Sequence, residues 1–307
     1  MTYDRDAALR YASQRWSTNC HDNKIMRLHN QAPINVEEKW KALRLQGRRE
    51  DWVMQWVRDP DGESAAFVKG SEVVPFQGWA GLADCAHFMS NALTAGGIKG
   101  LETDFVPYLN SFARKHIPFT KVLASEAPRA NVQRIINKNL MQKGDLILYV
   151  APPGGELGGG YVHSAMFVTN STITCHTVSR WDEDWKAPHD EGYTFTLIHF
   201  GHDDQRLALL DTELSGWWEI TWRSRSYYYF FSKGKVSYSL RDPGSNTAPM
   251  VLPTQTGSYF AQSYNQVTIC WPVTGTVEEV TVDIGNRKLS VLWNETERFS
   301  GKRRINK

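Results

Sequence analysis

The stretch DCAHFMSNAL, residues 84–93, predicts a helix that begins with a cysteine. Its apolar residues recur at three- and four-residue spacing, which is typical of a helix with one buried face. Asp84 is a common capping residue, and Gly96 and Gly97 predict the other end. Cys85 then lies in the first turn, where free amides and the helix dipole favour a thiolate and can stabilise an oxyanion. The stretch therefore predicts a nucleophilic cysteine, and the chain a cysteine hydrolase.

Two predicted strands downstream carry the histidines that such a cysteine needs. A strand over residues 146–150 leads through a glycine-rich loop into residues 162–168, and a third strand lies near 173–178. His163 lies on the second strand and His176 on or just after the third, and antiparallel pairing would bring these two side chains alongside each other. A helix followed by successive antiparallel strands indicates an α+β architecture.

Five segments of the N-terminal part carry a family resemblance. They are Tyr3-Asp4-Arg5, Asp84-Cys85, Gly144-Asp145, His163-Ser164-Ala165 and Cys175-His176-Thr177. In this order they resemble the bacterial amidase domain family, which belongs to the papain-like cysteine peptidase and amidase superfamily. The resemblance implies a papain-like catalytic domain, with the nucleophile helix packed on an antiparallel sheet. It also implies Cys85 as nucleophile, His163 as base and later general acid, and His176 as the residue that orients the imidazole.

Each of these residues also has a structural interpretation. Cys85 can be a small buried residue, His163 a core histidine, and His176 a histidine bonded to backbone. Asp84 needs no role beyond capping, although it can border an oxyanion site. His87 departs from the family, which often has Asn or Ser there, so it is either a pocket-lining residue or a competitor for the catalytic role.

Composition excludes several other classes of protein. The chain has 307 residues and a formal net charge of +2, whereas a non-specific nucleic-acid binder usually carries a marked basic excess. The four cysteines form no Cys-x-x-Cys pair, and the remaining histidines show no metal-ligand spacing. We therefore expect no metal and no cofactor, and we interpret the cysteines other than Cys85 as small buried hydrophobes.

The N-terminal residues indicate where the protein is made. Asp4 and Asp6 stand where a signal peptide would need positive charge and an apolar run. No apolar run is long enough for a membrane span. We expect a chain without a signal peptide, cytoplasmic at synthesis, that is secreted, if at all, by a signal-independent route.

The composition changes after residue 202. We predict a catalytic domain over residues 1–202, a polar linker over 203–215, and a small antiparallel β domain over 216–307, where aromatic and polar residues alternate. The aromatic side chains of that domain can fill its core, bind a secretion component or an immunity protein, or stack on sugars.

Three functions compete on this basis. The first is a cysteine amidase or endopeptidase that cuts peptidoglycan stem peptides, as an antibacterial effector. The second is a cysteine-dependent deamidase, acyl-transferring or protease toxin that acts on a protein of a host or target cell. The third is a non-catalytic binding protein with a vestigial cysteine site.

Overall fold

The computed structural model describes most of the chain, in two compact units. The described residues are 3–26, 33–45, 52–59, 62–75, 84–117, 119–154, 159–189, 192–201, 212–240, 255–263, 265–274, 276–283, 285–293 and 297–304. The first unit comprises Met1–Pro118 and Asn139–Tyr193, and the second comprises Phe119–Lys138 and Thr194–Lys307. Each unit is described by itself below.

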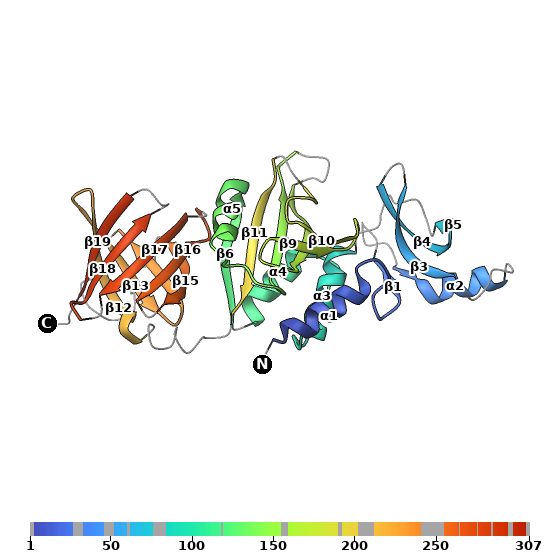
Figure 1. Cartoon of the computed structure of the whole chain (residues 1–307), viewed down its shortest axis with the longest axis horizontal. Helices are drawn as coiled ribbons and strands as arrows, with labels where there is room; N and C mark the ends of the chain where they lie inside the picture. The colour runs from blue at the N-terminus through green and yellow to red at the C-terminus, as the bar shows by residue number, and fades with distance from the viewer. Residues whose placement is uncertain are drawn as a thin grey trace. The chain divides into compact units, whose positions relative to one another are not determined.

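An antiparallel sheet with helices packed on it forms the main part of the first unit (Figure 1). Within this unit the sheet contains β7 (Leu146–Ala151), β8 (Gly160–Phe167), β9 (Thr172–Cys175) and β10 (Arg180–Asp184), in the order β10-β9-β8-β7. Helices α3 (Cys85–Ala95) and α4 (Val106–His116) both contact β8. Every residue of β7 is buried, which agrees with its continuous apolar sequence.

Helix α1 (Arg5–Arg15) packs against α3, and residues at its start contact the turn that precedes β7. The Tyr3 hydroxyl donates to the Gly144 carbonyl at 2.8 Å, and Arg5 pairs with Asp145 at 2.7 Å. A Cβ on Gly96 would lie 2.5 Å from the Tyr3 ring, so only glycine allows this approach. Tyr3, Arg5, Gly144 and Asp145 belong to the family resemblance, and their contacts here hold α1 against the turn before β7.

A smaller part of the first unit has its own sheet and core. It contains β1 (Lys24–Ile25), β2 (Ile34–Asn35), α2 (Val36–Leu45), β3 (Val53–Asp59), β4 (Gly62–Lys69) and β5 (Glu72–Pro75). Strands β3, β4 and β5 pair in that order, and Trp52 and Phe67 belong to a separate apolar cluster.

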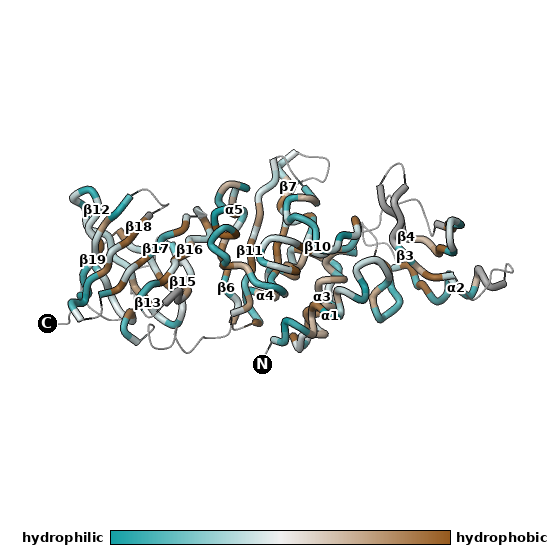
Figure 2. Tube along the Cα trace, in the orientation of Figure 1, coloured by the Kyte–Doolittle hydropathy of each residue, from teal (hydrophilic) through white to brown (hydrophobic). Residues whose placement is uncertain are grey.

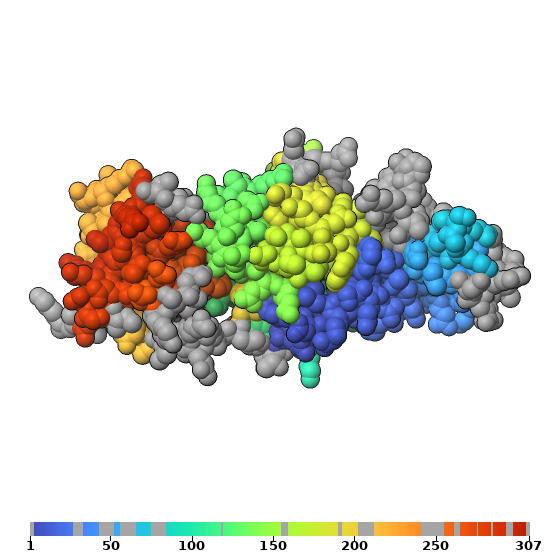
Figure 3. All heavy atoms as spheres, in the orientation of Figure 1, coloured from blue at the N-terminus to red at the C-terminus, as the bar shows by residue number. Residues whose placement is uncertain are grey.

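The second unit begins with a segment distant in sequence from the rest of it. Strand β6 (Thr120–Pro128) pairs with β11 (Thr194–Phe200), and α5 (Arg129–Asn137) packs on both strands. The Ser125 amide donates to the Pro272 carbonyl at 2.8 Å, and the Asn131 side chain donates to the Thr274 carbonyl at 2.9 Å. Figure 3 shows this green segment against the orange and red residues of the unit.

Eight antiparallel strands close into a barrel in the second unit. They are β12 (Gly216–Trp222), β13 (Arg225–Ser232), β14 (Lys235–Ser239), β15 (Gln255–Ser263), β16 (Gln266–Trp271), β17 (Thr276–Asp283), β18 (Lys288–Trp293) and β19 (Glu297–Arg303). Each strand pairs with the next, and β12 pairs with β19, so the sheet has no edge. Hydrophobic and hydrophilic residues alternate along these strands (Figure 2), and the inward set forms one core cluster.

The predicted fold class, an α+β papain-like domain followed by a small β domain, is wrong. Strands make up 46% and helices 23%, so the protein is mostly β, with the closed barrel as its largest β element. The physical reason lies in strands that the sequence did not reveal. Strands β15 and β19 complete the C-terminal barrel, and strands β3, β4 and β5 form a further antiparallel sheet in the N-terminal part. No helix in the described ranges is long and apolar enough to cross a membrane.

Candidate functional site

The Cys85 thiol lies at the position that its sequence predicts, in the first residue of helix α3. The residue is 4% exposed, and burial raises the pKa of its thiol, which the neighbouring Ser164 opposes. Ser164 belongs to β8, so the helix and this strand together surround the sulfur atom. In this state the thiol is protonated at neutral pH, and activation requires a base.

His163 is adjacent to Ser164 in β8, but its side chain contacts other residues. Consecutive residues of a strand point to opposite faces, so His163 points away from the face on which Ser164 meets Cys85. Its ring lies 5.3 Å from the ring of Tyr149 and 5.5 Å from that of His189. Burial, followed by the charges of His189 and Arg180, holds the pKa of His163 well below its usual value. Its Nε2 atom is buried and has no hydrogen-bond partner among the described residues.

Asp84 anchors a buried network and does not cap α3. Its side chain makes no capping hydrogen bond. One oxygen instead accepts from the Met26 amide at 3.0 Å and bonds to His87 at 2.9 Å, and the other bonds to His176 at 2.7 Å. Burial alone would raise the pKa of Asp84, but the bonds from His176 and His87 lower it to about 2. An ionised carboxylate only accepts hydrogen bonds, so Asp84 is no oxyanion donor.

The structure joins His87 and His176 through Asp84 and not through His163. His87 lies between two carboxylates, because its other ring nitrogen bonds to Asp22 at 2.8 Å. Burial opposes a charge on His87, but Asp22 and Asp84 raise its pKa to about 12. His176 follows β9, contacts the Arg15 carbonyl through Nε2 at 2.6 Å, and stacks on the ring of Phe88. Both ring nitrogens of each histidine are therefore engaged.

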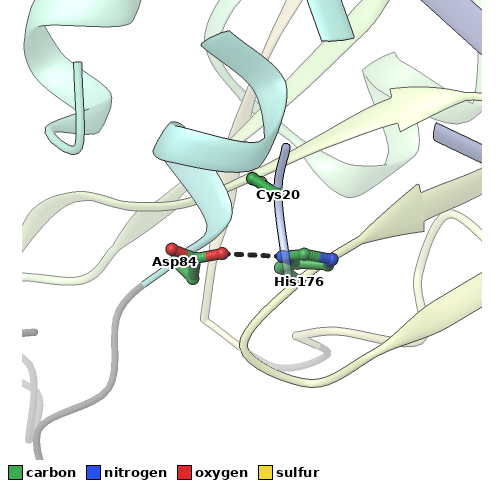
Figure 4. Close-up of side chains that lie close together, drawn as sticks. All are labelled: Cys20, Asp84 and His176. Carbon is green, nitrogen blue, oxygen red and sulfur yellow. Dashed lines mark hydrogen bonds and ion pairs between the residues drawn. The ribbon is translucent and has the colours of Figure 1, made fainter. Parts of the chain in front are cut away.

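Cys20 and Asp22 belong to this network and were missed by sequence reasoning. Burial raises the pKa of the Cys20 thiol, while the nearby His87 opposes the rise. The ligand atoms of Cys20, Asp84 and His176 lie within 4.8 Å of one another, and such donors suit a transition-metal ion. Figure 4 shows these side chains converging from separate segments. The sequence signal was weak, because the polar residues 20–22 acquire partners only through tertiary folding.

The network of Asp22, Asp84, His87 and His176 fixes three segments around the start of α3. It ties the stretch after α1, the first turn of α3 and the residues that follow β9. The Asp84 amide also donates to the Thr177 hydroxyl at 2.9 Å. The arrangement anchors the residue before Cys85 through both its side chain and its amide.

Comparisons with known proteins give no relative. No protein-family model, curated protein or solved structure matches the chain.

Proposed function

We propose that the first unit is a cysteine-dependent amide hydrolase in which Cys85 is the nucleophile and His163 the base. The observation that carries the proposal is the uncommitted nitrogen of His163. Its Nε2 is buried without a partner among the described residues, on the residue next to Ser164, which contacts the thiol. The low pKa of His163 keeps the ring neutral, and a neutral ring can accept a proton.

A local rearrangement of β8 is required to bring the two groups together. The pairing of β7 with β8 shifts between Tyr149, opposite His163, and Val150, opposite Tyr161, so Val162 is an extra residue. Such bulges twist a strand locally and often re-aim a side chain beside an active site. Rotation at Val162 would turn the His163 ring towards α3. Binding of substrate at the start of α3 would supply the free energy for this rotation.

The chemistry then follows in two steps. Nε2 of His163 takes the Cys85 proton, and the thiolate attacks the carbonyl carbon, with amides of the first helical turn donating to the oxyanion. The imidazolium gives its proton to the departing amine, which leaves a thioester on Cys85. Water loses a proton to His163 and hydrolyses the thioester, which regenerates the thiol. The resemblance to amidases supports amides of peptidoglycan stem peptides as the substrate class.

Product analysis tests the proposal. Purified protein is incubated with muropeptides, and the products are resolved by mass. We expect Cys85→Ala to abolish product and His163→Gln to lower the rate at least about a hundredfold. Cys175→Ala and His116→Gln are the matched controls, because each removes a thiol or an imidazole of the first unit that has no part in the proposed chemistry.

Thiol labelling gives an independent measurement. A thiolate paired with an imidazole reacts with iodoacetamide well below the pH at which an ordinary cysteine reacts. We expect Cys85 to be labelled first at pH 6, and substrate peptides to protect it, because they occupy the same thiol. Equal labelling of all four cysteines, together with wild-type protein that releases nothing from any wall peptide, would refute the proposal and favour a non-catalytic first unit.

A further inference from the structure

A cavity of about 190 Å³ opens at one end of the barrel in the second unit. Its lining residues share one end because β12, β14 and β16 finish there, whereas β13, β15 and β17 begin there. The opposite end is filled by large side chains, among them Trp218, Phe231 and Tyr259, which are buried in the core cluster. The barrel is therefore a cup that is closed by side chains at one end.

Aromatic rings form the wall of this cup. They are Trp222, Tyr227, Tyr229, Tyr238, Trp271 and Phe299. Neighbouring rings lie 5.4–6.2 Å apart, and they connect from Phe299 through Trp222, Tyr227, Tyr238 and Trp271 to Tyr229. The faces of such rings carry partial negative charge and attract cations.

One carboxylate lies among these rings. Glu278 of β17 is 4% exposed, and both of its oxygens accept from the Tyr229 hydroxyl, at 2.9 and 3.0 Å. Burial raises its pKa to about 7, although hydrogen bonds from Tyr229 and Trp271 oppose the rise. These two donors leave lone pairs of the carboxylate unused. No lysine, arginine or histidine is among the described residues that line the cavity.

We propose that the cup binds a small organic cation, of the methylated ammonium class. Its positive charge would pair with Glu278, and its methyl groups would pack on the aromatic faces. A neutral apolar ligand would bury the carboxylate without a counter-charge, which is costly. A sugar needs many hydrogen bonds, whereas the Tyr229 hydroxyl and the indole N–H groups of Trp222 and Trp271 in the described lining are already bonded to Glu278 or Glu297. The volume is below the roughly 300 Å³ of ordinary ligand pockets, which suits a headgroup-sized cation.

Paired ligands test the proposal on the unmodified protein. Choline and its uncharged carbon isostere, 3,3-dimethylbutan-1-ol, have nearly the same shape but differ in charge. Binding is followed by tryptophan fluorescence, since Trp222 and Trp271 line the cup, and by calorimetry. We expect choline to bind at least about tenfold more tightly than the isostere. Equal affinity for the two, or no binding of choline and of tetramethylammonium up to high millimolar concentration, would overturn the proposal.

Adjacent glutamates supply a matched pair of variants. Glu278→Gln should weaken choline at least about tenfold and leave the isostere unchanged, because only the ion pair is lost. Glu279→Gln alters the next residue, whose side chain is 48% exposed and pairs with Lys138, and should leave the affinity unchanged. An unaltered affinity in Glu278→Gln, with a native far-ultraviolet spectrum, or tight binding of chitin oligosaccharides in place of choline, would contradict the assigned ligand class.

Discussion

Asp84 and Glu278 are both buried carboxylates, yet their pKa values move in opposite directions. Asp84 bonds to two imidazoles, which can carry positive charge, and its pKa falls to about 2. Glu278 bonds to a phenol and an indole, which are neutral, and its pKa rises to about 7. The charge of the partner decides the outcome, because burial alone penalises both carboxylates.

Because the pKa of Glu278 is raised, its contribution to the free energy of unfolding decreases as pH rises. A carboxylate with a lowered pKa contributes more as pH rises. The folded state keeps the proton to a higher pH than the unfolded chain, whose pKa is near 4.5. The stabilising contribution is therefore complete below pH 4.5 and is lost as pH rises to about 7. Its size is about 3 kcal/mol, reduced by any relaxation around the group. Denaturant unfolding of the second unit, followed by tryptophan fluorescence between pH 4 and 8, measures this loss.

The variant Glu278→Gln is the control for that titration. Glutamine cannot ionise, so the loss of stability between pH 4.5 and 7 should largely disappear in the variant. Tyr229 and Tyr238 face Glu278 but titrate far above this range, because burial raises the pKa of both. The same pH slope in the variant as in the wild type would show that another group titrates.

The residues of the candidate site were predictable to different extents. The position of Cys85 follows from local rules, because an apolar period and a glycine pair define the helix, although the Asp84 side chain makes no capping bond. The partners of His176 and Asp84 depend on where distant segments meet, and sequence spacing does not contain that information. The polar residues of the stretch after α1 likewise acquire their partners only through tertiary folding.

At the scale of elements, turn chemistry was the most dependable signal. Residues 232–235, Ser-Lys-Gly-Lys between two aromatic-rich runs, are typical of a hairpin turn, and the β13–β14 hairpin lies there, with φ values of 48° at Lys233 and 72° at Gly234. Positive φ at both central residues is what such tight hairpins require. Strands β15 and β19 were missed because glycines interrupt their apolar pattern, at Gly257 and Gly301.

These glycines make room for barrel side chains, which gives a prediction about Gly257. A Cβ there would lie 2.7 Å from the Cys270 carbonyl and 2.9 Å from the Trp271 ring. Because the carbonyl belongs to the neighbouring strand, it cannot move aside cheaply. We expect Gly257→Ala to lower the free energy of unfolding by about 1–3 kcal/mol. Denaturant titration measures this change.

Gly285 is the matched control for Gly257. It lies in the turn between β17 and β18, and a Cβ there meets only the Asp283 carboxylate, at 3.8 Å. We expect Gly285→Ala to change stability by less than about 0.5 kcal/mol. Similar losses in both variants would mean that the space inside the barrel is not the cause.

At the scale of the whole molecule, the chain alternates between its two units. Residues 119–138 belong to the second unit, although they lie within the sequence of the first. Contacts such as that of Ser125 with Pro272 bind this segment to the barrel. Sequence composition indicates where the aromatic strands begin, but it does not show that an earlier segment packs against them. The predicted linker at 203–215 follows the change in composition. The compact units instead meet after residues 118, 138 and 193 of the chain.

The division into units predicts that perturbations placed in different units add. Asp84→Asn leaves the network around His87 and His176 without its central charge, so we expect a loss of roughly 3–5 kcal/mol. Gly257→Ala acts on the barrel, and the two residues share no hydrogen-bond or packing partner among the described contacts. The double variant should therefore lose the sum of the two changes within about 0.5 kcal/mol. Unfolding of all four proteins in urea gives this cycle directly, and a coupling above about 1 kcal/mol would show that the stability of one unit depends on the packing of the other.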